Sequence, residues 1–242
     1  MELFYFPLFK PGMKEIELSA EESYHARRVL RKQMDEVIEI TDGNGHHIQG
    51  IVTHVSRSHL TVRIRSYQKY SFDPANAIEI GLALIRPNRF SWAVEKLTEL
   101  GVRKIVPLIC HHSVIRDINL NHLLKVAVSA MKQSHQFYLP EISPVISFMS
   151  WMEACHNRPA LRFLAHLPLE EQEFSSRAGN MASEVILGVG PEGGFHQTEI
   201  ENALNFGFDF IKLNNTVLRS ETAAIVAVAQ LKLGLLRKNM SP

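Results

Sequence analysis

Two segments rich in glycine and turn residues, both near the carboxyl end, constrain the fold of this chain most strongly. In the first, β-forming residues 185–189 lead into a turn that contains Gly190, Pro191, Gly193 and Gly194, and residues 197–206 have a helical pattern. Glycine reaches backbone angles that other residues avoid and leaves no side chain between the main chain and a ligand. A turn of this kind at the carboxyl end of a sheet strand is a natural small-molecule site.

The second segment repeats this order. Residues 210–213 predict a short strand, Asn214 and Asn215 a turn, and Ser220 a cap on the closing helix. Only one helix and one strand separate the two turns, so they can form two walls of one pocket.

A dinucleotide site is the first alternative, because Gly188-x-Gly190-x-x-Gly193 fits the dinucleotide fingerprint and Asp209 lies near the expected ribose-binding acid. The motif is late in the chain, however, and Pro191 removes an amide that a pyrophosphate would use. A second alternative, that the glycines only make turns, leaves the neighbouring Arg219 and Glu221 without an explanation.

The motifs Gly190-Pro-Glu-Gly-Gly194 and Leu218-Arg-Ser-Glu-Thr-Ala223 together resemble the RsmE family of ribosomal RNA methyltransferases, in the SPOUT superfamily. The resemblance extends to residues 25–31 and 96–102. It implies an α/β fold in which a SPOUT-type trefoil-knot methyltransferase domain with a mainly parallel sheet follows a small PUA-like β-barrel. It also implies S-adenosyl-L-methionine as cofactor, N3 of a uridine in 16S rRNA or the small ribosomal subunit as target, and a homodimer with the knot domains at the interface.

The same resemblance assigns the sites. Arg219 and Glu221 are the expected catalytic residues, the first stabilising charge or positioning a phosphate, the second orienting the base or accepting a proton. A purely structural alternative is that Glu221 caps the helix and pairs with Arg219. The residues expected to bind the cofactor are His166, Gly188, Gly190, Pro191, Glu192, Gly193, Gly194, Leu213, Asn214, Asn215, Val217 and Leu218.

The amino-terminal part is rich in strand patterns, at residues 37–41, 48–55 and 60–64, with a hairpin turn at 42–45. We expect domains at 1–70 and 78–242, joined by a linker at 71–77. Ser19-x-x-Glu22 is a capping box that opens a helix through about Lys32. Ala26, Val29 and Leu30 share one side of it, and the cations expected to contact RNA phosphates lie on the other: Arg27, Arg28, Arg31 and Lys32.

Apolar strands alternate with helices from residue 78, which predicts a mainly parallel sheet covered on both faces. The expected strands are 78–85, 102–109 and 161–165, and the expected helices are 88–100, capped by Asn88 and ended by Gly101, and 121–136. Arg86 and Arg89 follow the first strand, on the edge that carries the glycine turns. We expect them to contact substrate RNA.

Composition limits the remaining classes. The 242 residues are 45% hydrophobic with a net charge of +1, so RNA contacts must come from local patches. Two cysteines, no signal-peptide pattern and no apolar stretch of ~20 residues predict a cytoplasmic protein without a membrane span. Twelve histidines include Cys110-His111-His112, but neighbours on a strand point to opposite faces, so we expect no metal.

Two motifs depart from the family pattern. Leu213-Asn-Asn-Thr216 lacks the family's glycine and arginine, and Lys132-Gln-Ser-His-Gln136 lacks another arginine. Asn214 can replace the glycine if it adopts a left-handed backbone angle. These departures keep two further hypotheses open: a SPOUT relative that methylates another RNA position, and an RNA-binding ribosome-assembly factor with reduced catalysis.

Overall fold

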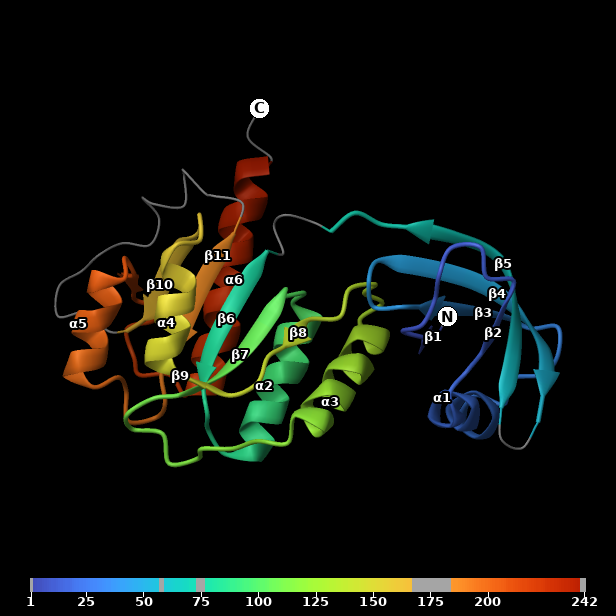
Figure 1. The fold of residues 1–242 in the computed structure, drawn as a ribbon, viewed down its shortest axis with the longest axis horizontal. Coiled ribbons are helices and arrows are strands. Elements are labelled where there is room, and N and C mark those ends of the chain that lie inside the picture. Colours follow the sequence, from blue (N-terminus) through green and yellow to red (C-terminus); the bar gives the residue numbers. More distant parts are fainter. Residues whose placement is uncertain (1, 57–58, 73–76, 167–183, 240–242) are drawn as a thin grey trace. The chain divides into compact units, whose positions relative to one another are not determined.

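The computed structural model describes residues 2–56, 59–72, 77–166 and 184–239. The chain forms two compact units, one of residues 1–72 with 128–139 and one of residues 73–127 with 140–242 (Figure 1). Residues 128–139, which we expected in the second domain, therefore cluster with the first unit. Part of the expected linker, residues 73–76, lies outside the described residues.

The first unit is built on a five-stranded sheet in the order β1-β3-β4-β5-β2. Its strands are β1 (Leu3–Tyr5), β2 (Glu15–Glu17), β3 (Val37–Thr41), β4 (His46–Val55) and β5 (Leu60–Lys69). The three expected strands are confirmed, although β5 is longer than expected. The expectation missed β1 and β2, because edge strands of three residues show too few alternations to give a periodic signal.

The helix of the first unit changes type along its length. The hydroxyl of Ser19 accepts from the amide of Glu22 at 3.2 Å, as a capping residue does, and starts α1 (Ala20–Tyr24). The next turn is the π-helix η1 (His25–Val29), in which the Leu30 amide bonds to the His25 carbonyl at 3.1 Å. The wider turn moves Val29 out of the core, leaving it 60% exposed, and ends the helix before Lys32. The expected continuous helix is therefore wrong in its last turn.

Residues 128–139 of the first unit include the end of α3 (Leu120–Gln133). The ammonium of Lys132 donates to the buried carboxylate of Glu22 at 2.6 Å. Beyond the helix, the Gly45 amide bonds to the Phe137 carbonyl at 2.8 Å. The Lys132–Glu22 pair therefore joins the end of α3 to the helix of the first unit.

The second unit has a seven-stranded sheet, in which every pairing is parallel, as expected. The order is β12-β10-β11-β6-β7-β8, with β9 also paired to β7. The strands are β6 (Ile78–Ala83), β7 (Lys104–Ile109), β8 (Glu141–Ile142), β9 (Ile146–Ser147), β10 (Leu161–Ala165), β11 (Val185–Val189) and β12 (Asp209–Ile211).

Helices cover both faces of this sheet. They are α2 (Pro87–Glu99), α4 (Phe148–His156), α5 (Gln197–Asn205) and α6 (Ser220–Asn239). In Figure 1, α4 lies in front of the sheet and α6 behind it. No helix in the described ranges is both long and apolar enough to cross a membrane.

Two helix starts differ from expectation. Helix α2 is capped by Arg86, with Pro87 at its first position, because proline needs no amide partner there; Asn88 lies inside the helix. Ser220 is the first residue of α6 and not its cap. Gly101, at φ +69°, ends α2 as expected.

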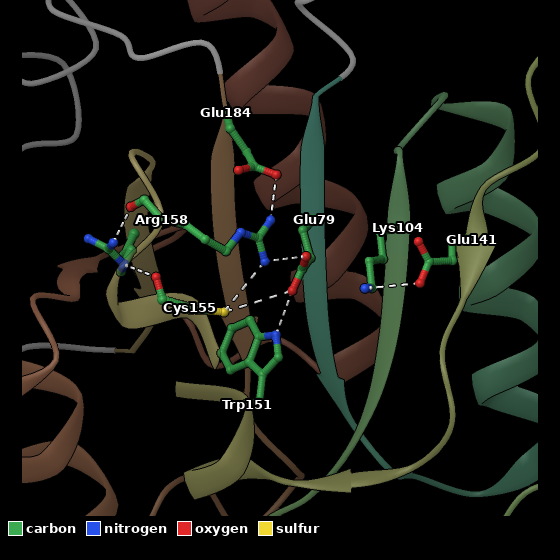
Figure 2. A network of polar contacts seen from close by, with 8 residues as sticks. Glu79, Lys104, Glu141, Trp151, Cys155, Arg158 and Glu184 are labelled. Atoms are coloured by element: carbon green, nitrogen blue, oxygen red, sulfur yellow. Dashed lines mark hydrogen bonds and ion pairs between the residues drawn. The ribbon is translucent and has the colours of Figure 1, made fainter. Parts of the chain in front are cut away.

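A buried ionic network closes the amino edge of the sheet (Figure 2). Glu79, near the start of β6, accepts from the Trp151 indole at 2.8 Å and pairs with Arg158 at 2.8 Å. Arg158 also pairs with Glu184, just before β11. Burial raises the pKa of the neighbouring Cys155 thiol to about 12, with the Glu79 carboxylate adding to the shift.

Candidate active site

A cavity of about 240 Å³ lies at the opposite, carboxyl edge of this sheet. The ends of β10, β11 and β12 and the first turn of α6 surround it, and most of its side chains are apolar. Its lining residues are Ala165, His166, Val189, Gly190, Pro191, Glu192, Gly194, Phe195, Ile211, Leu213, Asn214, Thr216, Val217, Leu218, Ser220 and Ala223. Both turns contribute, so the prediction that they form two walls of one pocket is confirmed.

The glycine turn forms the first wall. The Gly194 amide bonds to the Pro191 carbonyl at 2.9 Å, and Gly194 has φ +72°, an angle that glycine adopts without strain. Gly188 has a different task inside β11. A side chain there would come within 2.6 Å of Leu164 and 3.2 Å of the Trp151 ring. Its small size therefore allows the core to pack under the pocket.

The second wall is the turn after β12. The Asn214 side chain donates to the Thr216 hydroxyl at 2.9 Å and accepts from the Asn215 amide at 2.9 Å. Asn214 does not adopt a left-handed angle, so the expectation that it replaces a glycine in that conformation is wrong. Its side chain instead supplies the turn with hydrogen bonds.

A hydrogen bond joins the two walls. The Ser220 hydroxyl donates to the Gly190 carbonyl at 2.7 Å. Serine at this position therefore ties the start of α6 to the glycine turn and does not cap its own helix.

The structure brings most of the expected cofactor residues together. Nine of them line the cavity: His166, Gly190, Pro191, Glu192, Gly194, Leu213, Asn214, Val217 and Leu218. Gly188, Gly193 and Asn215 are not among the lining residues. Gly193 lies against His112, since a side chain on it would come 3.2 Å from the His112 Cβ.

His166 closes one side of the cavity, at the end of β10. Its amide donates to the Ile211 carbonyl at 3.2 Å, and its ring lies 5.5 Å from the Phe210 ring, centroid to centroid. Burial lowers the pKa of this imidazole. A neutral ring is thereby favoured on a largely apolar wall.

The two expected catalytic residues occupy different environments. Neither of them lines the cavity, and Arg219 is exposed. Glu221 is only 5% exposed, and its Oε2 atom has no hydrogen-bond partner. Its Oε1 atom lies 3.7 Å from Nε of Arg89, which also pairs with Glu192 of the glycine turn. The sequence did not indicate this three-residue arrangement, although the expectation that Arg89 and the glycine turn share one edge is confirmed.

The expected RNA-contacting cations divide between the units. In the first unit Arg28 and Arg31 are exposed, and Lys32 pairs with Glu36 at 3.1 Å. Arg27 is half-buried on the same helix. In the second unit Arg86 is exposed beside the partnered Arg89.

Three histidines gather beside the glycine turn. His111 and His112 lie in a turn after β7, not on a strand as expected, and His196 starts α5. The His111 and His196 rings are 4.3 Å apart, centroid to centroid. Within the described ranges, no group of three or more histidines, cysteines and acids has the geometry to hold a metal ion.

Fold and cavity together define the class. The second unit is an α/β domain that presents a small-molecule cavity at the carboxyl edge of a parallel sheet, and the first is a small β-rich module. Residues 73–232 match the RNA methyltransferase domain model and residues 18–65 the RNA methyltransferase PUA domain model. The chain therefore belongs to the RNA methyltransferase domain family.

Individual relatives agree with this assignment. Ribosomal RNA small subunit methyltransferase E of Rickettsia conorii is 27% identical over 223 residues, which are 90% of each chain. A candidate methyltransferase from Legionella pneumophila, solved with the cofactor SAM bound, is 26% identical over 96% of both chains, with a TM-score of 0.86. A candidate rRNA methyltransferase from Porphyromonas gingivalis is 28% identical over 98% of this chain and 99% of that one, with a TM-score of 0.88.

Proposed function

We propose that this protein transfers a methyl group from S-adenosyl-L-methionine to N3 of a uridine in 16S ribosomal RNA. The observation that carries the proposal is the cavity that residues 190–195 and 213–223 form together, because these segments contain the two motifs that resemble the RsmE family. Relatives of similar length that carry the name ribosomal RNA small subunit methyltransferase E support the choice of substrate.

The cavity fits an adenosyl group. Val189, Ile211 and Leu218 offer apolar contacts for a flat ring, while main-chain groups of the two turns offer hydrogen bonds. At about 240 Å³ the cavity is slightly smaller than most such sites, so a nucleoside-sized ligand would fill it and reach its mouth. The nine lining residues from the expected set would hold the cofactor, and Gly188 would support them from below.

Methylation at N3 requires removal of a proton from uracil. S-adenosyl-L-methionine supplies the methyl group as a sulfonium donor. The buried Glu221 carboxylate has an oxygen without a partner, and such an atom gains most from a new hydrogen bond. We assign Glu221 to orienting the uracil or accepting its N3 proton, and the exposed Arg219 to stabilising the charge on the uracil oxygens or a phosphate.

RNA contacts would come from local clusters of cations. Arg27, Arg28, Arg31 and Lys32 on the barrel helix, and Arg86 before α2, are the proposed phosphate contacts. A base inside a folded RNA must be turned out of its stack before it reaches a pocket of this size.

The proposal extends to assembly and location. Following the family resemblance, we propose that the second unit is knotted, that it forms a homodimer through its knot domain, and that the enzyme works in the cytoplasm during ribosome biogenesis. Leu233 on α6 is 57% exposed, which fits an apolar helix covered by a second copy. Light scattering of the purified protein should give twice the mass of one chain.

The deciding experiment is a nucleoside digest. Small ribosomal subunits that lack the modification are incubated with the purified protein and tritiated S-adenosyl-L-methionine, and the digested RNA is separated by chromatography. Label in 3-methyluridine supports the proposal, and label in any other nucleoside shows that the target differs. Calorimetric heat from the cofactor without label in RNA would indicate an assembly factor with reduced catalysis.

A further inference from the structure

Arg89 occupies an unusual position for a cation expected to bind RNA. It lies in the first turn of α2, and its guanidinium contacts carboxylates from two other segments. One is Glu192 of the glycine turn; the other is Glu221 in the first turn of α6, 3.7 Å from Nε. The three side chains therefore connect the starts of two helices with the wall of the cavity.

Glu221 depends on this contact. Its side chain is 7% exposed, and among the described residues Arg89 is the one cation that forms an ion pair with it. A carboxylate buried without a cation is strongly disfavoured, and the second oxygen of Glu221 already lacks a partner. Without Arg89, both Glu221 and Glu192 would lose a neutralising charge at the same edge.

Arginine suits this task better than lysine would. Its planar guanidinium presents five donors in a fixed fork, so one side chain can serve two carboxylates from different directions. Two carboxylates also neutralise its charge, which leaves little attraction for a phosphate. The neighbouring Arg86 differs in both respects, since it is exposed and forms no ion pair within the described part of the chain.

We infer that Arg89 is a positioning residue for the methyl-transfer site and is not a phosphate contact. It holds the Glu221 carboxylate in a fixed position relative to the glycine turn. The inference rests on the proposed function, because it gives Arg89 a role in that reaction. The Ser220 hydroxyl bond to Gly190, at 2.7 Å, links the same two segments independently. The glycine turn is therefore joined to the start of α6 in two ways. Arg89 connects the carboxylates of Glu192 and Glu221, and Ser220 bonds to the main chain at Gly190.

The test compares Arg89→Ala with Arg86→Ala, two arginines three residues apart at the same helix start. For each purified variant, calorimetry gives the Kd for S-adenosyl-L-methionine, and steady-state kinetics with small ribosomal subunits give kcat and KM at several salt concentrations. Arg89→Ala should lower kcat about 100-fold and weaken cofactor binding about tenfold, with KM for the subunit unchanged. Arg86→Ala should raise KM for the subunit and retain kcat. The slope of log KM against log salt concentration should fall by about one, as expected for the loss of one phosphate contact.

Arg89→Lys adds a graded control. Lysine keeps the charge but cannot span both carboxylates, so it should recover only part of kcat. A phosphate contact would behave differently, since lysine would restore most of the RNA affinity. Normal kcat and cofactor Kd in Arg89→Ala, together with a raised KM and a smaller salt slope, would overturn the inference.

A stability measurement separates this inference from the proposed function. Thermal unfolding of Arg89→Ala, Glu221→Gln and the double variant should be non-additive, with the second substitution costing less once the first is present. Additive shifts would show that the two residues are not coupled, whatever the reaction. Wild-type protein that neither binds the cofactor nor methylates RNA would instead refute the proposed function and leave the coupling to be judged from the unfolding data alone.

Discussion

Two buried glutamates, at opposite edges of the same parallel sheet, differ in their hydrogen-bond and ion-pair partners. At the amino edge Glu79 accepts from Trp151 and pairs with Arg158, which itself pairs with Glu184 (Figure 2). At the carboxyl edge Glu221 has one ion pair at 3.7 Å and an oxygen with no hydrogen bond. The two carboxylates are similarly buried, at 3% and 5% exposure.

The two carboxylates differ in how completely their oxygens are hydrogen-bonded. A buried charge is tolerable when each of its oxygens has a partner, and Glu79 meets this condition. Glu221 does not meet it, because its buried Oε2 atom has no hydrogen bond to offset the loss of hydration. The unpartnered oxygen fits the role we propose for Glu221, in which a substrate group supplies the missing hydrogen bond. Substitutions at the two edges should therefore affect stability and catalysis differently.

The largest effect should come from Glu79→Ala. The change leaves Arg158 and the Trp151 indole without their shared acceptor inside the unit, so the free energy of unfolding should fall by about 3–5 kcal/mol. Urea unfolding measures the loss. Cofactor affinity of the folded fraction should stay within twofold, because the network lies at the far edge from the cavity. A loss of affinity without a loss of stability would contradict the structural role.

Glu221→Gln should show the opposite profile. The amide keeps the shape but cannot accept a proton as readily, so kcat should fall about 100-fold, equivalent to about 2.7 kcal/mol. Stability should be unchanged or slightly higher, because a buried charge with an unpartnered oxygen is removed. Single-turnover methylation at saturating cofactor gives the rate. Full turnover would show that Glu221 has no chemical role.

Two glycine substitutions sharpen the comparison further. Gly188→Ala places a methyl group against Leu164 and Trp151 and should cost about 1–3 kcal/mol of stability through overpacking. Gly194→Ala meets no atom within 4 Å but requires φ +72°, which strains the turn by about 1 kcal/mol. Calorimetry should therefore show that Gly194→Ala loses more cofactor affinity, although Gly188→Ala is less stable. The reverse order would place Gly188 in the binding site itself.

Local chemistry explains why the sequence predicted the cavity. The turn at 190–194 follows from glycine and proline, and the parallel sheet follows from continuous apolar strands such as 185–189. Both signals are contained in a few neighbouring residues. The two walls could therefore be located without knowing the rest of the fold.

Other features depend on residues far apart in the chain. Lys132 meets Glu22 across 110 positions, and this partnership helps bring residues 128–139 into the first unit. Arg89 meets Glu192 across 103 positions. Sequence shows that such side chains are charged but not which opposite charge folding brings to them. The π-helical turn at 25–29 is similar, since its wider spacing reverses the exposure expected for Val29.

The smallest expected effect concerns His166 on the cavity wall. Burial holds its pKa below the ordinary value of 6.5 in the folded protein. As pH falls through 6.5 the unfolded chain takes up a proton that the folded one does not, so the protein loses stability until the pH passes the lower, folded pKa. Wild-type protein should therefore lose stability between neutral and mildly acidic pH relative to His166→Gln. Thermal unfolding of both proteins across this range measures the difference. A constant difference would mean that the imidazole is not desolvated and that this wall of the cavity is open to water.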